Sequence, residues 1–166
     1  GDGHNIRYAI VPCPLGWVAV AATLRGICMI ELGDCEELLR REVSARFPNA
    51  VLEGEDAAFM ALVSQVIELL ASPQPSTNLP LDVQGTAFQR KVWEALRSIP
   101  VGETSTYSHV ARAIGQPSAS RAVASACAAN PVAVVIPCHR VVRSDGDLSG
   151  YRWGVERKRQ LLERER

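Results

Sequence analysis

The sequence predicts an α+β protein of two lobes: an N-terminal antiparallel β-sheet lobe with helices and a C-terminal, mainly helical lobe. Three observations predict this division. Residues 6–32 contain short extended runs, residues 81–166 contain amphipathic helical stripes, and a stretch rich in proline and small polar residues, 72–80, lies between them. We therefore expect one lobe over residues 1–80, including the connection, and a second over residues 81–166.

The N-terminal lobe begins with the extended runs RYAIVPC, WVAVAAT and ICMIEL, separated by the turn-prone PLG and LRG. Asp34 followed by Glu37 resembles an N-cap with its capping-box partner, and predicts a helix that ends before Pro48. A second helix is predicted by apolar residues that recur at helical spacing and that we expect in the core: Phe59, Leu62, Val63, Val66, Ile67 and Leu70.

The C-terminal lobe begins with a second capping pair, Thr86 and Gln89, followed by an amphipathic helix that should end near Pro100 and Gly102. Two short helices follow. The segment TYSHVARAI predicts the first, and Gly115 is a typical C-terminal stop.

The second short helix should run from about Ser118 to Asn130, which makes the pair resemble a helix-turn-helix. Its largest apolar side chain is Val123, and most other positions are Ala or Ser. A helix this thin is either buried within the lobe or able to approach a partner closely. Arg121 is a long cation on this low-profile helix, which favours a helix that reaches into a groove.

The composition is that of a globular protein, with 47% hydrophobic and 22% charged residues in a chain of 166. No apolar run approaches the roughly 20 residues needed to cross a bilayer. The N-terminus also lacks the layout of a secretory signal. We therefore expect a cytoplasmic protein with no membrane partner.

The five cysteines include no CxxC pair, which argues against a disulfide framework and against a zinc site. We expect reduced thiols, with Cys13 and Cys28 as small core residues. The formal net charge is zero, but residues 1–85 carry −6 and residues 86–166 carry +6. The basic half is the candidate for contact with an anion, and its composition alone leaves nucleic acid and a solvated face equally open.

The chemistry concentrates in PVAVVIPCHRVV, residues 131–142, where an apolar, strand-like run meets Cys138, His139 and Arg140. Cationic neighbours lower the pKa of a thiol, so we expect Cys138 to be a nucleophile with a lowered pKa. In a regular strand Cys138 and His139 would point to opposite faces. They can cooperate only if the chain bends or a water bridges them, and Pro137 makes a bend plausible.

The segment PCHRVV resembles the active-site signature of the O6-alkylguanine-DNA alkyltransferases. Three other segments are similar to family segments in order and spacing, and together they extend over residues 81–166: GTAFQRKVWEALRSIPVGETSTYSHVARAIG, SRAVASACAANP and SGYRWGVERKRQLL. The preceding β lobe is also similar to the N-terminal lobe of the family. The resemblance implies single-use repair, in which the methyl group of O6-methylguanine in duplex DNA is transferred irreversibly to the protein.

The family roles carry over to five residues. The resemblance implies that Cys138 accepts the methyl group, that His139 draws off the thiol proton through a water, and that Glu165 orients the imidazole. Asn130 matches the residue that steadies this network. Tyr107 matches the tyrosine that helps rotate the target nucleotide and supplies a proton to the leaving guanine.

The target base must leave the duplex to meet a sulfur embedded in a fold, and the resemblance implies that Arg121 fills the gap it leaves. The second short helix would enter the minor groove. The implied DNA contacts are Arg121, Tyr107, Ser118, Ala119, Ala122, Ser125 and Arg140. The implied substrate pocket consists of Pro137, Val142, Ser149, Gly150, Tyr151, Arg152 and Trp153.

Many family members have small residues where this chain has Arg152 and Trp153, in the loop that closes over the extruded base. Their bulk should narrow the pocket, which predicts fast repair of O6-methyl and much slower repair of O6-benzyl adducts. A surface-exposed Trp153 with no pocket role is the alternative.

The resemblance further implies no dissociable cofactor and no metal, because the damaged DNA is itself the methyl donor. It implies a monomer that acts on double-stranded DNA carrying O6-alkylguanine at the bacterial nucleoid, with O4-methylthymine as a second substrate. The SGYRWG loop is most similar to the branch of the family with an upstream zinc-binding, transcription-activating domain.

Three alternatives stay open at this level: a noncatalytic alkyltransferase-like protein that recruits other repair factors, a DNA-binding regulator with Cys138 in its core, and a Cys-His hydrolase that turns over repeatedly. The cysteine itself speaks against the first.

Overall fold

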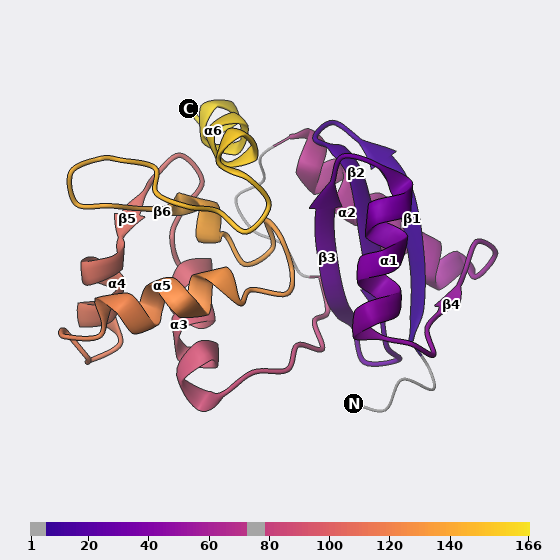
Figure 1. Ribbon diagram of the computed structural model, residues 1–166, viewed down its shortest axis with the longest axis horizontal. Helices are drawn as coiled ribbons and strands as arrows, with labels where there is room; N and C mark the ends of the chain where they lie inside the picture. The colour runs from indigo at the N-terminus through magenta and orange to yellow at the C-terminus, as the bar shows by residue number, and fades with distance from the viewer. Residues whose placement is uncertain (1–5, 73–78) are drawn as a thin grey trace. The chain divides into compact units, whose positions relative to one another are not determined.

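The computed structural model describes residues 6–72 and 79–166, and the chain divides into two compact units, residues 1–84 and 85–166 (Figure 1). The predicted α+β class is confirmed. Most of the proline-rich connection expected at residues 72–80 lies outside the described residues. In the described part of the chain, no helix combines the length and the apolar character needed to cross a membrane.

The N-terminal unit contains a four-stranded sheet in the order β3-β2-β1-β4. The three predicted strands are confirmed as β1 (Arg7–Cys13), β2 (Gly16–Ala22) and β3 (Ile27–Gly33), joined as antiparallel neighbours. The fourth, β4 (Val51–Leu52), pairs in parallel with β1 and was not predicted. Two residues are too few to form a recognisable alternating pattern.

Helices α1 (Glu36–Arg46) and α2 (Ala57–Ala71) cover opposite faces of this sheet (Figure 1). The strand β2 is therefore buried on both sides, and residues 18–22 are fully shielded from solvent. Ala19 and Ala21 share a core cluster with Leu39 and Val43 of α1. The core positions of α2 confirm four of the predicted stripe residues: Phe59, Val63, Val66 and Leu70.

The ends of α1 follow the prediction only in part. The helix ends before Pro48, as expected. The predicted capping box at Asp34 and Glu37 is wrong, because Cys35 is the N-cap and makes no side-chain cap hydrogen bond. The S/T/D-x-x-E pattern is short and occurs by chance, so it identifies a helix start only when the backbone presents the cap residue at the right position.

The C-terminal unit is mainly helical. Its elements are α3 (Ala87–Arg97), β5 (Ser105–Thr106), α4 (Tyr107–Ala113), α5 (Ser120–Ala128), the 3₁₀ turn η2 (Cys138–Arg140), β6 (Val141–Val142) and α6 (Val155–Arg164). The predicted capping box at the start of α3 is confirmed, since Thr86 and Gln89 bond to each other's backbone. Trp93 of α3 donates through its indole nitrogen to the carbonyl of Ala126 in α5, at 2.9 Å.

Helices α4 and α5 form the predicted helix-turn-helix, and Gly115 in the turn has a φ of +80°. The alternative that α5 is buried all round is wrong. Val123, Ala126 and Cys127 face the core. The opposite face is exposed, and it carries Arg121, Ala122, Ser125 and Ala128.

Residues 131–136 are not the predicted strand but a buried succession of turns. The side chain of Asn130 closes them from one end: its oxygen accepts from the backbone N–H of Val132 at 2.9 Å, and its nitrogen donates to the carbonyl of Ile136 at 2.8 Å. Val134 has a φ of +69°, an uncommon conformation for a β-branched residue. A side-chain amide thus satisfies backbone groups that a strand would pair with a neighbour.

Candidate active site

Cys138 lies at the edge of a cavity of about 350 Å³ in the C-terminal unit, with only 4% of its surface exposed. The cavity lies among the end of α5, the start of α4 and the loop before α6. Its lining residues are Tyr107, Ala124, Cys127, Ala128, Cys138, Ser149, Gly150, Tyr151 and Arg152. The thiol of Cys138 is thus sheltered from bulk water but open to a cavity of ligand size.

The expectation of a lowered pKa for Cys138 is wrong, because burial raises the pKa of this thiol to about 11. The hydrogen bond from Asn130 and the charges of Lys158 and Arg152 act in the opposite direction but do not overcome the loss of hydration. At neutral pH Cys138 is therefore a thiol, and a nucleophilic role requires a base that removes the proton during the reaction.

Asn130 contacts the sulfur directly. Its side-chain nitrogen lies 3.3 Å from Cys138 Sγ while it also donates to the carbonyl of Ile136. The residue is fully buried, and both ends of its amide are hydrogen-bonded. A buried donor held this firmly would favour the thiolate as negative charge develops on the sulfur.

His139 follows Cys138 in η2, and its ring is fully buried. The bend anticipated at Pro137 occurs as this 3₁₀ turn. His139 Nε2 lies 2.8 Å from Glu165 Oε2, whereas His139 Nδ1 is buried with no hydrogen-bond partner among the described residues. Burial lowers the pKa of the imidazole, so the neutral ring donates through Nε2 to Glu165 and keeps Nδ1 as a proton acceptor.

Arg140 is 8% exposed and points inward, which corrects its expected role as a DNA contact. Its guanidinium donates to both oxygens of Glu165 and to the backbone carbonyl of Ile99. Glu165 accepts a hydrogen bond from His139, and its hydrogen bonds from His139 and Arg140 hold its pKa at about 2 despite burial. Sequence adjacency to Cys138 was misleading, because successive residues of a tight turn point in different directions.

Lys158 in α6 was missed by the sequence analysis. Its ammonium is fully buried and donates to the carbonyls of Val141, at 2.7 Å, Gly150, at 3.2 Å, and Leu148. These contacts tie the loop before α6 to β6, beside Cys138. A lysine between two arginines of a charged helix carries no sequence signal for burial, because Arg157 and Arg159 resemble it in charge and spacing.

The loop before α6 supplies the lid-like wall of the cavity. The Tyr151 and Trp153 rings meet edge to face with centroids 5.3 Å apart, and the Arg152 guanidinium lies over the Trp153 ring. Ser149, which lines the cavity, has a φ of +65°, an uncommon backbone conformation for a residue other than glycine.

Some residues expected in the pocket do not line the cavity, and some lining residues were not expected there. Ser149–Arg152 line the cavity as expected. Tyr107, which was expected in a catalytic and DNA-contacting role, lines it too, and burial raises the pKa of its hydroxyl. Pro137, Val142 and Trp153 do not line it. Trp153 is 4% exposed and packs behind Tyr151, so the alternative of an exposed Trp153 is also wrong. Cys127, on the inner face of α5, is a lining residue that the sequence analysis placed in no site.

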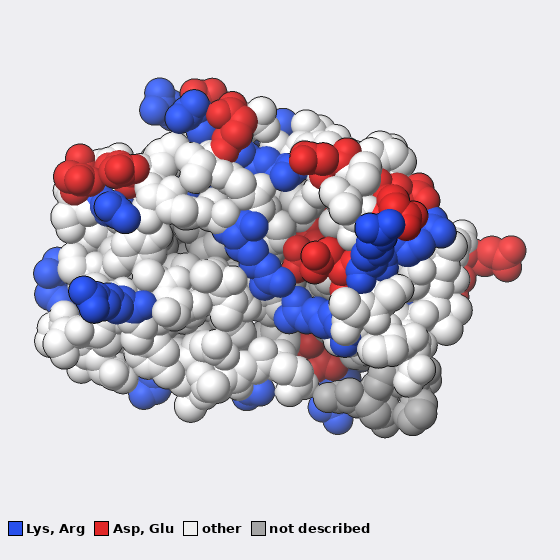
Figure 2. All heavy atoms as spheres, in the orientation of Figure 1, with Lys and Arg blue, Asp and Glu red and all other residues white. Residues whose placement is uncertain are grey.

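The expected DNA-contacting positions on and before α5 are mostly at the surface. Ser118, Arg121, Ala122 and Ser125 are exposed, and Ala119 is half-buried. Figure 2 shows Lys and Arg side chains separated by neutral surface on the face in view, without one continuous basic patch. Small neutral side chains beside one exposed arginine are the arrangement that a narrow groove admits.

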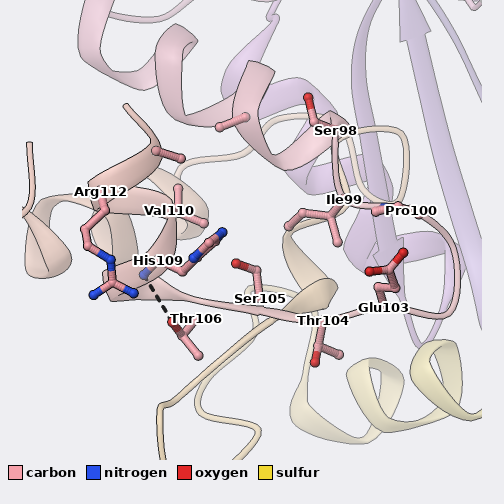
Figure 3. Close-up of a pocket in the computed structure, with 12 residues that line it drawn as sticks. Ser98, Ile99, Pro100, Glu103, Thr104, Ser105, Thr106, His109, Val110 and Arg112 are labelled. Carbon is pink, nitrogen blue, oxygen red and sulfur yellow. Dashed lines mark hydrogen bonds between the residues drawn. The ribbon is translucent and has the colours of Figure 1, made fainter. Parts of the chain in front are cut away.

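A second cavity, of about 500 Å³, lies between α3, α4 and the segment 98–106 (Figure 3). The side chains of Ile99, Ser105 and His109 lie around its centre, and Glu103 and Arg112 lie towards its two ends. It contains no cysteine. Its wall adjoins the buried network through Ile99, whose carbonyl accepts a 2.7 Å hydrogen bond from Arg140.

The C-terminal unit thus combines a helix-turn-helix with a sheltered cysteine and a buried histidine, and the comparisons with known proteins name the family. Residues 6–83 match the ribonuclease-like domain of 6-O-methylguanine DNA methyltransferase, and residues 87–166 match the DNA binding domain of the same family. The chain therefore belongs to the 6-O-methylguanine DNA methyltransferase family.

Individual relatives are similar over nearly the whole of this chain. The chain is 54% identical, over 99% of its length, to the bifunctional transcriptional activator/DNA repair enzyme Ada of Escherichia coli, but it spans about half, 47%, of that protein. It is 45% identical to the methylated-DNA--protein-cysteine methyltransferase of Mycobacterium tuberculosis, over 97% of this chain and 93% of that one. The crystal structure of M. tuberculosis OGT in complex with DNA has a TM-score of 0.81 and 33% identity, covering 96% of this chain and 92% of that one.

Proposed function

We propose that this chain repairs DNA by transferring the methyl group of O6-methylguanine to Cys138, once per protein molecule. The observation that carries the proposal is a buried thiol at a cavity that α4, α5 and the loop before α6 surround. The next residue, His139, is hydrogen-bonded to Glu165 and can serve as the base. The similarity to methylated-DNA--protein-cysteine methyltransferases supports the same reaction.

The proposed reaction is a displacement at the methyl carbon. The sulfur of Cys138 forms a bond to that carbon while the bond from carbon to guanine O6 breaks and its electron pair stays on the oxygen. The thiol proton passes to His139 Nδ1 through a water, and Tyr107 is placed in the cavity wall to protonate the leaving guanine. The product is a thioether, which no side chain in this network can cleave, so the protein is consumed.

Histidine is essential in this scheme because the pKa of the Cys138 thiol is about 11. Few molecules are thiolates at neutral pH, and proton transfer must accompany attack. The free Nδ1 of His139 would accept the thiol proton, and the charge of Glu165 would stabilise the imidazolium that results. Asn130 would stabilise the developing negative charge on the sulfur.

Extrusion of the base from the duplex is part of the proposal. Unstacking costs a few kcal/mol, and less for a poorly paired lesion. Phosphate contacts and insertion of Arg121 from the exposed face of α5 would offset a cost of that size. The alanines and serines of that face would let the helix approach the floor of the minor groove.

A single assay separates this proposal from the noncatalytic, regulatory and hydrolytic alternatives. The protein is mixed with excess duplex DNA carrying O6-methylguanine labelled in the methyl group, and the protein is analysed by mass spectrometry. We expect one methyl group per molecule, on the peptide that contains Cys138. An unchanged mass would support the binding alternatives, and continued release of label would support the hydrolase.

The matched variants are Cys138→Ala and Cys35→Ala, the latter removing an exposed thiol of the N-terminal unit. Cys138→Ala should abolish transfer and keep lesion binding nearly intact, whereas Cys35→Ala should transfer like the parent. Loss of both transfer and binding in Cys138→Ala would point to misfolding and would leave the mass measurement on the parent to decide.

Arg121→Ala tests the extrusion step separately. We expect transfer from duplex DNA to slow while transfer from a single-stranded lesion changes little, because the gap-filling role exists only in a duplex. A full rate on duplex DNA would contradict this role for Arg121.

Finer assignments complete the proposal: action as a monomer at the bacterial nucleoid, a second activity on O4-methylthymine, and an upstream zinc-binding, transcription-activating domain in the full-length protein. The last is supported by the identity to Ada together with the half of Ada that this chain spans. Sedimentation on the chain and transfer assays with O4-methylthymine test the parts that concern this segment.

A further inference from the structure

We propose that Arg140 is a positioning residue: it clamps Glu165 in the orientation that accepts from His139 Nε2, and thereby leaves His139 Nδ1 free to take the Cys138 proton. This inference rests on the proposed function. It replaces the DNA-contacting role that the sequence predicts for Arg140 with an indirect role in proton transfer.

The Arg140 guanidinium donates three hydrogen bonds, two of them to Glu165. Arg140 Nε donates to Glu165 Oε1 at 2.9 Å, and Arg140 Nη2 donates to Glu165 Oε2 at 2.9 Å. These two bonds form the planar fork that a guanidinium makes with a carboxylate. A third bond, from Arg140 Nη1 to the carbonyl of Ile99 at 2.7 Å, anchors the guanidinium to the segment after α3.

Glu165 needs such an anchor because of its position. It is the C-cap of α6, where the partial negative charge of the helix disfavours a carboxylate. Its side chain is nevertheless only 5% exposed, and its Oε2 accepts from both His139 and Arg140. Without the guanidinium, a buried carboxylate at a helix C-terminus would either move towards water or take up a proton.

The pH dependence has a definite sign. The charges that act on His139 are Glu165 at the end of α6, Arg140 in η2 and Lys158 within α6. The charge of Lys158 also acts on Cys138, and the buried Tyr151 hydroxyl interacts electrostatically with Cys138 and Glu165. Arg140 lowers the pKa of Glu165 and also that of His139. Its removal raises both pKa values, so His139 becomes protonated, and Glu165 neutral, at a higher pH than in the parent.

The experiment compares Arg140→Gln, which removes the charge, with Arg140→Lys, which keeps the charge but not the fork. Arg97→Gln, at an exposed arginine of α3, is the matched control. The full chain is mixed with saturating O6-methylguanine duplex across a pH series, and the single-turnover rate is recorded together with the final amount of methyl transferred. The dissociation constant for the same duplex is measured at several salt concentrations.

We expect Arg140→Gln to slow transfer on the order of 100-fold, the usual cost of a misplaced catalytic group. The acid limb of its rate profile should move to higher pH, and Arg140→Lys should fall between it and the parent. The dissociation constant and its salt dependence should equal those of Arg97→Gln.

Two outcomes overturn the inference. One is an unchanged rate profile per active molecule with less active protein, which shows a structural role only. The other is weaker DNA binding with a salt slope reduced by about one, which indicates a phosphate contact. If Arg140→Gln does not fold, Arg140→Lys decides by the same criteria. Failure of the parent to accept any methyl would instead overturn the proposed function.

Discussion

The two units of this chain bury different kinds of side chain. The N-terminal sheet and its helices enclose almost purely apolar residues, with Glu31 as the one buried polar or charged residue described there. The C-terminal unit buries Asn130, His139, Arg140 and Lys158 close to one thiol. Packing alone specifies the first unit, whereas the second also depends on a polar network whose members must all be satisfied.

The largest effect on stability should come from the apolar unit. Phe59 is fully buried in α2, with the Arg7 guanidinium 5.4 Å from its ring centre. Phe59→Ala should lower the free energy of unfolding by about 3–5 kcal/mol, because it leaves a cavity in a sheet-helix interface. Chemical denaturation followed by circular dichroism measures this. Leu52→Ala, at a residue 59% exposed, is the control and should change little.

In the C-terminal unit, replacement of Lys158 should loosen the cavity wall and slow transfer. Lys158→Met keeps the length of the side chain but leaves the carbonyls of Val141, Leu148 and Gly150 without their shared donor. Unsatisfied buried groups cost about 1–3 kcal/mol each, so we expect the cavity wall to loosen and transfer to slow at least about 100-fold. Arg159→Met, at the exposed neighbour, should keep the parent rate. A parent-like rate for Lys158→Met would mean that the loop holds its conformation without the ammonium.

Burial of the Cys138 thiol predicts low reactivity towards an alkylating reagent. A pKa of about 11 for Cys138, raised from 9.0, lowers the thiolate fraction at neutral pH about 100-fold. Iodoacetamide should therefore modify the exposed Cys35 well before Cys138. Labelling of Cys138 should accelerate as pH rises towards 11. Peptide mapping by mass spectrometry over time shows the order, and early labelling of Cys138 at neutral pH would contradict its desolvated state.

The shape of the cavity predicts the alkyl preference. Arg152 lines the cavity and donates to the carbonyl of Asn130 at 2.6 Å, whereas Trp153 packs behind the wall. We expect the parent to repair O6-benzyl adducts much more slowly than O6-methyl adducts, and Arg152→Ala to raise the benzyl rate about 10-fold, or about 1.4 kcal/mol in barrier height. Competition with free O6-benzylguanine measures both rates. Equal rates on the two adducts in the parent would refute the narrow pocket.

The smallest effect should come from a local feature at the start of the C-terminal unit. Thr86→Ala removes one half of the capping box of α3 and should lower the free energy of unfolding by about 1 kcal/mol. Asp34→Ala should cost less, since the cap of α1 is formed at Cys35 without a side-chain hydrogen bond. An equal or larger loss for Asp34→Ala in thermal unfolding would mean that Asp34 stabilises the turn before α1 by other contacts.

Local patterns predicted most of the fold. The three long strands, the core stripe of α2, the capping box at Thr86 and the stop at Gly115 all depend on residues within a turn or two of one another along the chain. The exceptions include β4, which is too short for a pattern, and the capping box expected at Asp34, because Cys35 is the N-cap of α1. Residues 131–136 are a further exception, because the amide of Asn130 replaces a neighbouring strand there.

By itself the sequence predicted Cys138 as the nucleophile, with His139 and Glu165 as its partners. It also predicted the helix-turn-helix and the family, because these are carried by residue types at set spacings. Only the tertiary structure decided that the pKa of Cys138 is raised, that Arg140 holds Glu165, and that Lys158 ties the loop before α6 to β6. The reason is physical: a pKa or a hydrogen bond depends on desolvation and on neighbours in space, and residues adjacent in the chain are often not those neighbours.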